Sequence, residues 1–269
     1  MTGSGERAGK LGDVRVHPEA LVDPAAELEP GVTVGPWSII GPGVVVGKGT
    51  TIGPGVLVER NTRIGRDCEL HKGAVLGTDP QDLKFGGEDT HLQVGDRTTI
   101  REYATLNRGT AASGITEVGD DCLLMAYTHV AHDCRLGNHV VLSNAVNMAG
   151  HVEIEDWVIV GGLTPIHQFV KVGAHAFVGG GSRISKDVVP YCRVAGSPPK
   201  IYGLNTLGLE RRGFSAATRT ELKKAYRILF QSHLNVSQAL ARAREEVEPL
   251  PEVVHFLDFI EMSERGVTF

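Results

Sequence analysis

The segment HVAHDC places His132 directly before Asp133. A histidine beside a carboxylate has the elements of a general base, because the imidazole can take a proton from a hydroxyl and return it to a leaving group. Two further segments, MAGHV and IHQF, contribute His151 and His167. Gly150 has no side chain, so its backbone N–H could approach a developing oxyanion. Together these residues predict a polar site for proton transfer.

These segments lie within a six-residue repeat. An apolar residue stands at every sixth position from Val16 to Leu76, again from Val94 to Leu106, and from Val118 to Ile184. A period of six fits neither an α-helix nor simple strand alternation, but it is typical of a parallel β-helix built from short strands and turns. We expect the recurring apolar residue to point inward, with glycine or asparagine at corners that need a positive φ.

Three hexads make one triangular coil of 18 residues, so residues 18 positions apart are expected to stack. Counting from His132, this arithmetic leads to Gly150 and then to Gln168. The three histidine segments should therefore meet at one edge, within about 10 Å. A second column, Ala126, Asn144, Gly162 and Gly180, has mostly small side chains. Either these residues leave a groove for an acyl chain, or the glycines serve corner turns.

A zinc site is the alternative chemistry for three histidines, because three neutral imidazoles can hold zinc and leave one position open. Hexapeptide-repeat carbonic anhydrases bind zinc in this way, with a ligand pair spaced HxxxxH. His129 and His132 are instead spaced HxxH. We therefore expect acid–base catalysis without a metal.

The composition divides the chain of 269 residues into segments. Glycine and proline are concentrated before residue 201, and two turn-rich segments near 78–93 and 109–117 interrupt the repeat. After Pro198 and Pro199 the apolar pattern is helical, with a candidate N-cap at Ser215 and further helices near 236–246 and 250–264. We predict a flexible N-terminus at 1–13, a β-helix at 14–197 and a small helical domain at 198–269.

Charge and apolar patterning exclude several classes of protein. The net charge of −5 argues against non-specific nucleic-acid binding. No apolar run is long enough to span a membrane, and the first residues lack the apolar core of a secretory signal, so we expect a cytoplasmic protein. The cysteines form no CxxC pair, which favours buried, reduced thiols.

Basic charge is concentrated around the start of the helical domain, where ten cations face three acidic residues. A solvated helix face explains part of this excess. A docking surface for an acidic partner, or a clamp for nucleotide phosphates, would explain the rest. The cations are Arg183, Lys186, Arg193, Lys200, Arg211, Arg212, Arg219, Lys223, Lys224 and Arg227.

The HVAHDC, AGHV and HQF segments, the loop sequence PQDLKF and the helical entry GLERRGF occur in an order and spacing that closely resemble the UDP-N-acetylglucosamine O-acyltransferase family. The resemblance covers about residue 14 to the end. It implies a left-handed β-helix, a homotrimer and the first step of lipid A biosynthesis. In that step an (R)-3-hydroxyacyl chain moves from acyl carrier protein to the 3-position of UDP-N-acetylglucosamine, and no cofactor is required.

The same resemblance implies roles for individual residues. His132 would be the general base, supported by Asp133, with Gly150 at the oxyanion. Gly162 and Gly180 would line the acyl groove, and Gly180 matches the position that sets chain length. The remaining substrate-binding residues would be Gln81, Asp82, Lys84, His129, His151, His167, Gln168, Asn205, Arg211 and Arg212.

Two positions depart from the family pattern, and several alternatives stay open. Asn107 stands where histidine is common, so the same transfer onto a 3-amino UDP-sugar, forming an amide, is the main alternative. Leu207 stands where a glutamate often helps to bind the nucleotide. The related N-acyltransferase carries an additional N-terminal domain, whereas this repeat begins by Val16. A short-chain acetyltransferase would leave the helical tail unexplained. A purely structural rod would leave the His132 column unexplained.

Overall fold

The computed structural model describes residues 13–269. The predicted flexible N-terminus, residues 1–13, lies outside this range apart from Asp13. Two compact units make up the chain, the first ending at Arg135 and the second covering Leu136–Phe269. Within residues 13–269, the structure contains no helix that combines the length and the apolar character of a membrane span.

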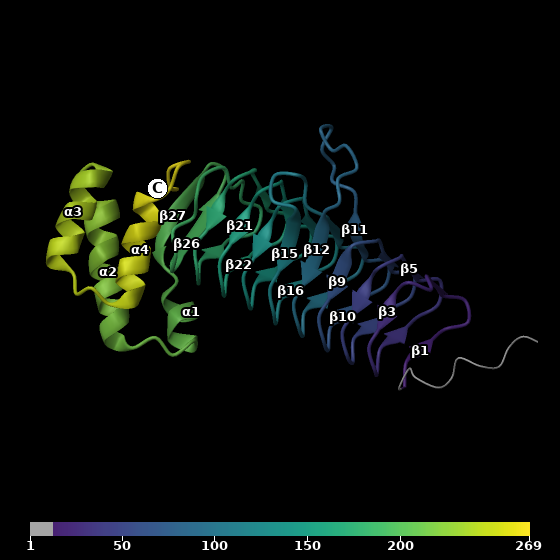
Figure 1. Cartoon of the computed structure of the whole chain (residues 1–269). Helices are drawn as coiled ribbons and strands as arrows, with labels where there is room; N and C mark the ends of the chain where they lie inside the picture. Colours follow the sequence, from purple (N-terminus) through teal and green to yellow (C-terminus); the bar gives the residue numbers. More distant parts are fainter. Residues whose placement is uncertain (1–12) are drawn as a thin grey trace, which may run out of the picture. The chain divides into compact units, whose positions relative to one another are not determined.

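The first unit is a stack of coils whose short parallel strands form three faces (Figure 1). One face consists of β1 (Arg15–Val16), β4 (Thr33–Val34), β7 (Thr51–Ile52), β10 (Glu69–Leu70), β13 (Thr99–Ile100) and β16 (Leu123–Leu124). The second consists of β2 (Leu21–Val22), β5 (Ile39–Ile40), β8 (Leu57–Val58), β11 (Val75–Thr78), β14 (Thr105–Asn107) and β17 (His129–Val130). The third consists of β3 (Glu27–Leu28), β6 (Val45–Val46), β9 (Thr62–Ile64), β12 (His91–Val94) and β15 (Ile115–Val118). The unit ends within β18 (Arg135–Leu136).

Strand register confirms the hexapeptide arithmetic and locates its interruptions. Val16 pairs with Val34, which is a shift of one regular coil. The first inserted loop, residues 79–90, widens the shift, so that Leu76 pairs with Leu106. A second inserted loop, residues 108–114, also makes the shift longer than one regular coil, so that Leu106 pairs with Val130. The longer loop projects from the coils after β11 (Figure 1). These insertions match the two predicted interruptions of the repeat.

The repeat residues form the core, but the corners differ from expectation. Apolar repeat residues such as Ile40, Val58 and Leu106 are almost fully buried. Many corners with positive φ carry large side chains, including Tyr103 at +57° and Trp157 at +63°. Left-handed backbone strains a non-glycine residue, but inter-coil contacts stabilise it. The Tyr103 amide donates to the carbonyl of Lys72, and the Tyr103 ring stacks on the ring of Tyr127 at the next corner.

The second unit continues the same coil type and ends in helices. One face consists of β19 (Val141–Leu142), β22 (Ile159–Val160), β25 (Phe177–Val178), β26 (Cys192–Gly196) and β27 (Pro199–Leu204), the last two forming an antiparallel pair. The other faces contain β20 (Asn147–Met148) with β23 (Pro165–Ile166), and β21 (Glu153–Ile154) with β24 (Lys171–Val172). The helices are α1 (Thr206–Arg211), α2 (Ala216–Gln231), α3 (Val236–Glu246) and α4 (Pro251–Glu261).

The helices form a core against the last strands of the same unit. Ser215 caps α2, as predicted, by accepting a hydrogen bond from the Thr218 amide at 3.0 Å. Leu222 and Phe256 are buried in one cluster with Cys192. Packing an apolar helix stripe in this way supplies most of the stability of such short helices. Cys68, Cys122, Cys134 and Cys192 are all free and buried, which confirms the prediction for the thiols.

Candidate active site

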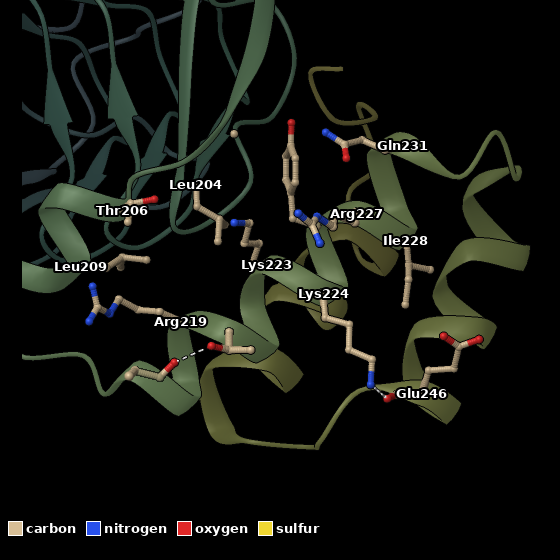
Figure 2. A pocket seen from close by; sticks show the side chains of 14 residues that line it. Leu204, Thr206, Leu209, Arg219, Lys223, Lys224, Arg227, Ile228, Gln231 and Glu246 are labelled. Carbon is tan, nitrogen blue, oxygen red and sulfur yellow. Dashed lines mark hydrogen bonds between the residues drawn. The ribbon is translucent and has the colours of Figure 1, made fainter.

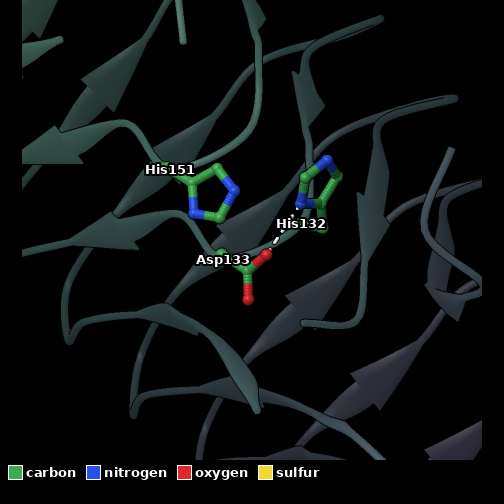
Figure 3. Close-up of side chains that lie close together, drawn as sticks. All are labelled: His132, Asp133 and His151. Carbon is green, nitrogen blue, oxygen red and sulfur yellow. Dashed lines mark hydrogen bonds and ion pairs between the residues drawn. The ribbon is translucent and has the colours of Figure 1, made fainter. Parts of the chain in front are cut away.

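His132 and Asp133 form a hydrogen-bonded pair just after β17 (Figure 3). His132 Nδ1 lies 2.8 Å from Asp133 Oδ2. The Asp133 side chain is completely buried, whereas 14% of the His132 side chain is exposed. Asp133 occupies a corner with φ of +59°, which turns its carboxylate back toward the preceding histidine. The imidazole is therefore held from one side and accessible to solvent over part of its surface.

The loop of residues 108–114 surrounds the Asp133 carboxylate with donors. Asp133 Oδ1 accepts hydrogen bonds from the Thr110 amide at 2.9 Å and the Ser113 amide at 3.3 Å. The Ser113 hydroxyl also donates to Oδ1, and the Thr110 hydroxyl donates to Oδ2 at 2.7 Å. The Asp133 amide donates to Thr116 Oγ1 at 2.8 Å. The carboxylate is thus fixed on several sides, which limits the positions that His132 can adopt.

These contacts determine the protonation state of the pair. Burial by itself would raise the pKa of Asp133, but hydrogen bonds from Ser113, His132 and Thr110 outweigh it and lower the pKa to about 2. An ionised carboxylate can only accept hydrogen bonds, so His132 Nδ1 must carry the donated proton. The lone pair of neutral His132 is then on Nε2, which is the form that a general base needs.

We expect the Asp133 network to stabilise the fold in a pH-dependent way. Because its folded pKa of about 2 lies below the ordinary 3.8, its contribution is present above pH 3.8 and lost as pH falls toward 2. The shift corresponds to about 2 kcal/mol. Urea unfolding of the wild type and Asp133→Asn should therefore show a stability difference that shrinks by about two thirds of this amount between about pH 6 and about pH 2.5.

Glu19→Gln, which removes an exposed carboxylate, is the matched control for this titration. Its stability relative to the wild type should not follow the same acid transition. A difference between the wild type and Asp133→Asn that stayed constant across the acid range would contradict the assigned pKa of Asp133.

His129 lies one coil away from Thr105 on the same face. The register of β14 and β17 pairs these two residues, and Thr105 Oγ1 lies 2.7 Å from His129 Nδ1. Burial lowers the pKa of His129, and the nearby His132 lowers it further. His129 is therefore neutral near pH 7, which suits a polar contact better than an ionic one.

Asn107 and Arg108 anchor the loop of residues 79–90, which carries predicted binding residues. The Asn107 amide group donates to Thr78 Oγ1 at 2.8 Å and to the Asp79 carbonyl at 3.0 Å. The buried Arg108 guanidinium forms an ion pair with the Asp79 carboxylate and lies 5.7 Å from the centroid of the Phe85 ring. The base of the loop is therefore rigidly attached to the coils.

The predicted binding residues lie beyond this anchored base. Gln81 and Lys84 are exposed, and Asp82 is half-buried. The Asp82 carboxylate accepts from the Lys84 amide at 3.0 Å, which shapes the turn. Gln81 and Lys84 are therefore open to solvent for a ligand.

The second unit holds the other predicted polar residues. The pairing of β20 with β23 sets Gly150 one coil from Gln168, and the Gly150 carbonyl accepts from the Phe169 amide at 3.3 Å. The His151 ring stacks on Phe169 with centroids 4.5 Å apart. His167 Nδ1 lies 3.2 Å from an Arg265 nitrogen at the surface. Within this unit the 18-residue spacing therefore holds.

Gly162 and Gly180 stack closely, and neither adopts a positive φ. A Cβ on Gly180 would lie 3.1 Å from the Gly162 carbonyl oxygen, and one on Gly162 would lie 3.0 Å from the Asn144 carbonyl oxygen. Both glycines lie at corners, but the positive φ there belongs to their neighbours, Leu163 at +58° and Gly181 at +69°. Close stacking keeps these two positions of the column free of side chains.

A cavity of about 420 Å³ beside α1 contains Asn205, Arg211 and Arg212. Arg212 lies 5.1 Å from the centroid of the Trp157 ring, and burial lowers its pKa. The buried Asn205 side chain is used in the fold, since it accepts from the Gly208 amide at the start of α1 and donates to the His175 carbonyl. Leu207, on the cavity wall, is 58% exposed and offers no charge.

Sequence reasoning missed the residues that hold Asp133 and the loop. The sequence shows Thr110 and Ser113 only as part of a turn-rich segment, and no pattern in it singles out Arg108. Counting 24 residues back from Asp133, the shift that the strands show here, leads to Gly109, directly beside Thr110. The regular 18-residue count skips this neighbour because the inserted loop changes the register.

Comparisons with known proteins agree with this arrangement. A family model described as Udp N-acetylglucosamine O-acyltransferase, Domain 2, matches residues 187–268, and a model of bacterial transferase hexapeptide repeats matches residues 43–78. The chain is 52% identical over 258 residues to an acyl-(acyl-carrier-protein)–UDP-N-acetylglucosamine O-acyltransferase from Paracidovorax citrulli, covering 94% of this chain and 98% of that protein. A relative of the same name from Alkalilimnicola ehrlichii is 48% identical over 254 residues, with the same coverage.

Solved structures give the same result. The chain matches a UDP-N-acetylglucosamine acyltransferase from Bacteroides fragilis with a TM-score of 0.92 and 40% identity, covering 94% of this chain and 99% of that one. A related structure from Acinetobacter baumannii gives 0.90 and 41%, with the same coverage. The predicted fold class, a left-handed parallel β-helix followed by C-terminal helices, is confirmed.

Proposed function

The chain belongs to the UDP-N-acetylglucosamine O-acyltransferase family, and from this premise we infer that it performs the first step of lipid A biosynthesis. It transfers a 3-hydroxyacyl chain from acyl carrier protein to the 3-hydroxyl of UDP-N-acetylglucosamine. The relatives described above are named for O-acyl transfer, so the amide-forming alternative that Asn107 suggested has no support. The hydrogen-bonded pair of His132 and Asp133 is the observation that carries the chemistry.

His132 acts as the general base in the proposed mechanism. Its Nε2 takes the proton from the sugar hydroxyl as that oxygen attacks the thioester carbonyl carbon. The carbonyl π electrons move to oxygen, and when the carbonyl re-forms, the C–S bond breaks. His132 then gives its proton to the departing thiolate. Asp133 stays ionised throughout and stabilises the transient imidazolium through Nδ1, as its low pKa allows.

The other predicted residues keep the roles that the family pattern gives them. We assign the oxyanion contact to the Gly150 amide, and substrate contacts to His129, His151, His167 and Gln168. Gln81, Asp82 and Lys84 fit a substrate-binding loop, because the anchored base supports an open tip. Arg211 and Arg212 fit contacts to nucleotide or prosthetic-arm phosphates in the cavity beside α1. Asn205 supports that cavity through its hydrogen bonds at the start of α1.

Gly180→Met is expected to shorten the preferred acyl chain. At Gly162 and Gly180 the column has no side chain to block a bound chain, and methionine would fill that space at Gly180. Because a Cβ would lie 3.1 Å from the Gly162 carbonyl oxygen, a small backbone adjustment is also expected. The measurement is a panel of 3-hydroxyacyl carrier proteins of increasing length, with the melting temperature as the control for folding. An unchanged length preference in a folded variant would exclude Gly180 from the acyl groove.

Assembly, compartment and domain limits are further proposals. We propose a homotrimer, which the exposed Trp37, Leu83 and Tyr127 support, since large exposed apolar side chains often mark interfaces. Light scattering of the purified protein tests it.

A cytoplasmic location fits the four free cysteines, because a reducing compartment keeps thiols unpaired. We also propose 14–197 and 198–269 as the two domains, since helices α1–α4 all follow Leu204.

A mass-resolved acyl-transfer assay tests the function directly. The enzyme receives 3-hydroxyacyl carrier proteins of several chain lengths together with UDP-N-acetylglucosamine, and in parallel the 3-amino analogue. We expect the ester product on the hydroxyl sugar. Product on the amino analogue alone, or no product with either acceptor, would overturn the proposed reaction.

A further inference from the structure

A second, larger cavity lies in the helical part of the second unit, between the end of β27, α1, α2 and the last residue of α3 (Figure 2). Its volume of about 870 Å³ is in the range of small-molecule sites. Leu204, Leu209 and Ile228 give it apolar walls. The substrate roles assigned above leave this cavity unused.

One wall of the cavity is a row of cations along α2. Arg219, Lys223 and Arg227 follow one another at intervals of four residues, so they share one face of the helix. Lys224 joins them and donates to the backbone carbonyl of Glu246. The Glu246 carboxylate also lines the cavity, but it lies 2.7 Å from Arg242 and is thereby neutralised. The lining therefore carries an excess of positive charge.

This row does not serve the stability of the helix. Like charges four residues apart repel one another. Within residues 13–269, Lys223 and Arg227 have no carboxylate within ion-pair distance, and Arg219 has one, Glu210 at 3.6 Å. Arg219 Nε is buried with no hydrogen-bond acceptor among the same residues. A buried donor without an acceptor is costly, so the arrangement suits a ligand rich in anionic oxygens.

Helix α1 separates this cavity from the one that holds Arg211 and Arg212. Leu209 faces the larger cavity, Arg211 and Arg212 line the smaller one, and Thr206 borders both. Glu210 ties the same helix to Arg219. An anion that binds Arg219 competes with Glu210 for the guanidinium, so its binding would act on the helix that carries the predicted substrate arginines.

We propose that the larger cavity is a regulatory site for a nucleoside di- or triphosphate. The phosphates contact Arg219, Lys223 and Arg227, and the apolar walls hold the nucleoside. Binding releases Glu210 and changes the affinity of the smaller cavity through α1. Only this last step rests on the proposed function, because binding itself can be measured without turnover.

Calorimetry with ATP and, separately, inorganic pyrophosphate tests the site, with UDP-N-acetylglucosamine saturating to fill the substrate site. ATP and pyrophosphate should both bind the wild type, ATP more tightly because of its nucleoside. Lys223→Gln with Arg227→Gln should weaken both at least about tenfold. The matched control, Lys48→Gln with Arg63→Gln, removes the same charge from exposed positions of the first unit and should bind normally. Glu210→Gln should strengthen binding, since Arg219 loses its competing carboxylate.

Several results would overturn the proposal. The first is that neither anion binds the wild type. The second is that both double variants lose the same affinity for the anions. The third is that the double variant of Lys223 and Arg227 loses affinity for acyl carrier protein but binds the anions normally. The last result would make the cations a protein-docking surface. ATP binding that leaves the KM for the UDP-sugar unchanged would refute the regulatory step alone, and the basal rate of the wild type reports independently on the proposed reaction.

Discussion

Replacing His132 by alanine is expected to lower kcat by about 10²–10⁴-fold, which is the usual contribution of a positioned general base. The reason is local, because Nε2 of this imidazole is the nitrogen that the Asp133 hydrogen bond leaves with a lone pair. The KM values for both substrates should change little, since the lost interaction acts in the transition state. Steady-state kinetics with the acyl carrier protein substrate measures both quantities.

The controls separate lost chemistry from lost structure. His17→Ala removes an exposed histidine of the first coil and should keep wild-type activity. Circular dichroism of His132→Ala should retain the β-helix spectrum, because His132 keeps some solvent exposure and fills no core position. If folded His132→Ala turned over at the wild-type rate, His132 would not be the base.

Asp133→Asn is expected to reduce kcat by a comparable factor, about 10²–10⁴-fold, although the side chain keeps its shape. The pocket around Asp133 supplies hydrogen-bond donors from Thr110 and Ser113, and an ionised carboxylate accepts all of them. An amide has only one accepting atom. Its NH2 group must face either these donors or His132 Nδ1, and in the second case the histidine carries its proton on Nε2 and cannot act as a base.

A double variant distinguishes positioning from independent action. Residues that act as one unit lose activity non-additively, so His132→Ala with Asp133→Asn should be no slower than His132→Ala alone. The pH profile of kcat/KM adds a second readout, because the acidic limb, where protonation inactivates a general base, should disappear without His132. Losses that multiplied in the double variant would show that Asp133 acts separately from His132.

Thr110 and Ser113 show how tertiary structure completed a pair that the sequence already indicated. His132 and Asp133 are adjacent, so their types alone predict acid–base chemistry. The donors to Asp133 come from a loop 20 to 23 residues away, and the register across that loop is 24 residues instead of 18. A regular repeat count therefore leads past them.

The long loop is a second case in which the sequence indicates a segment but not the contacts that anchor it. Its interruption of the hexad pattern is plain in the sequence, and the turn-rich composition predicts an exposed segment. The ion pair between the buried Arg108 and the exposed Asp79 is not visible there, because an arginine in a strand-and-turn repeat ordinarily faces solvent. Asn205 is a similar case, because at the start of α1 its side-chain oxygen accepts a hydrogen bond from the backbone amide of Gly208.

The sequence by itself determined the coil period, the buried repeat residues, the free thiols, the helical tail and the histidine beside a carboxylate. Each depends on local spacing, which backbone geometry converts directly into strands, turns and helix faces. Only the tertiary structure decided which donors hold Asp133, why Gly162 and Gly180 must be small, and how α1 divides two cavities. Those features depend on inserted loops and on close approach between coils, and neither follows from a period of six.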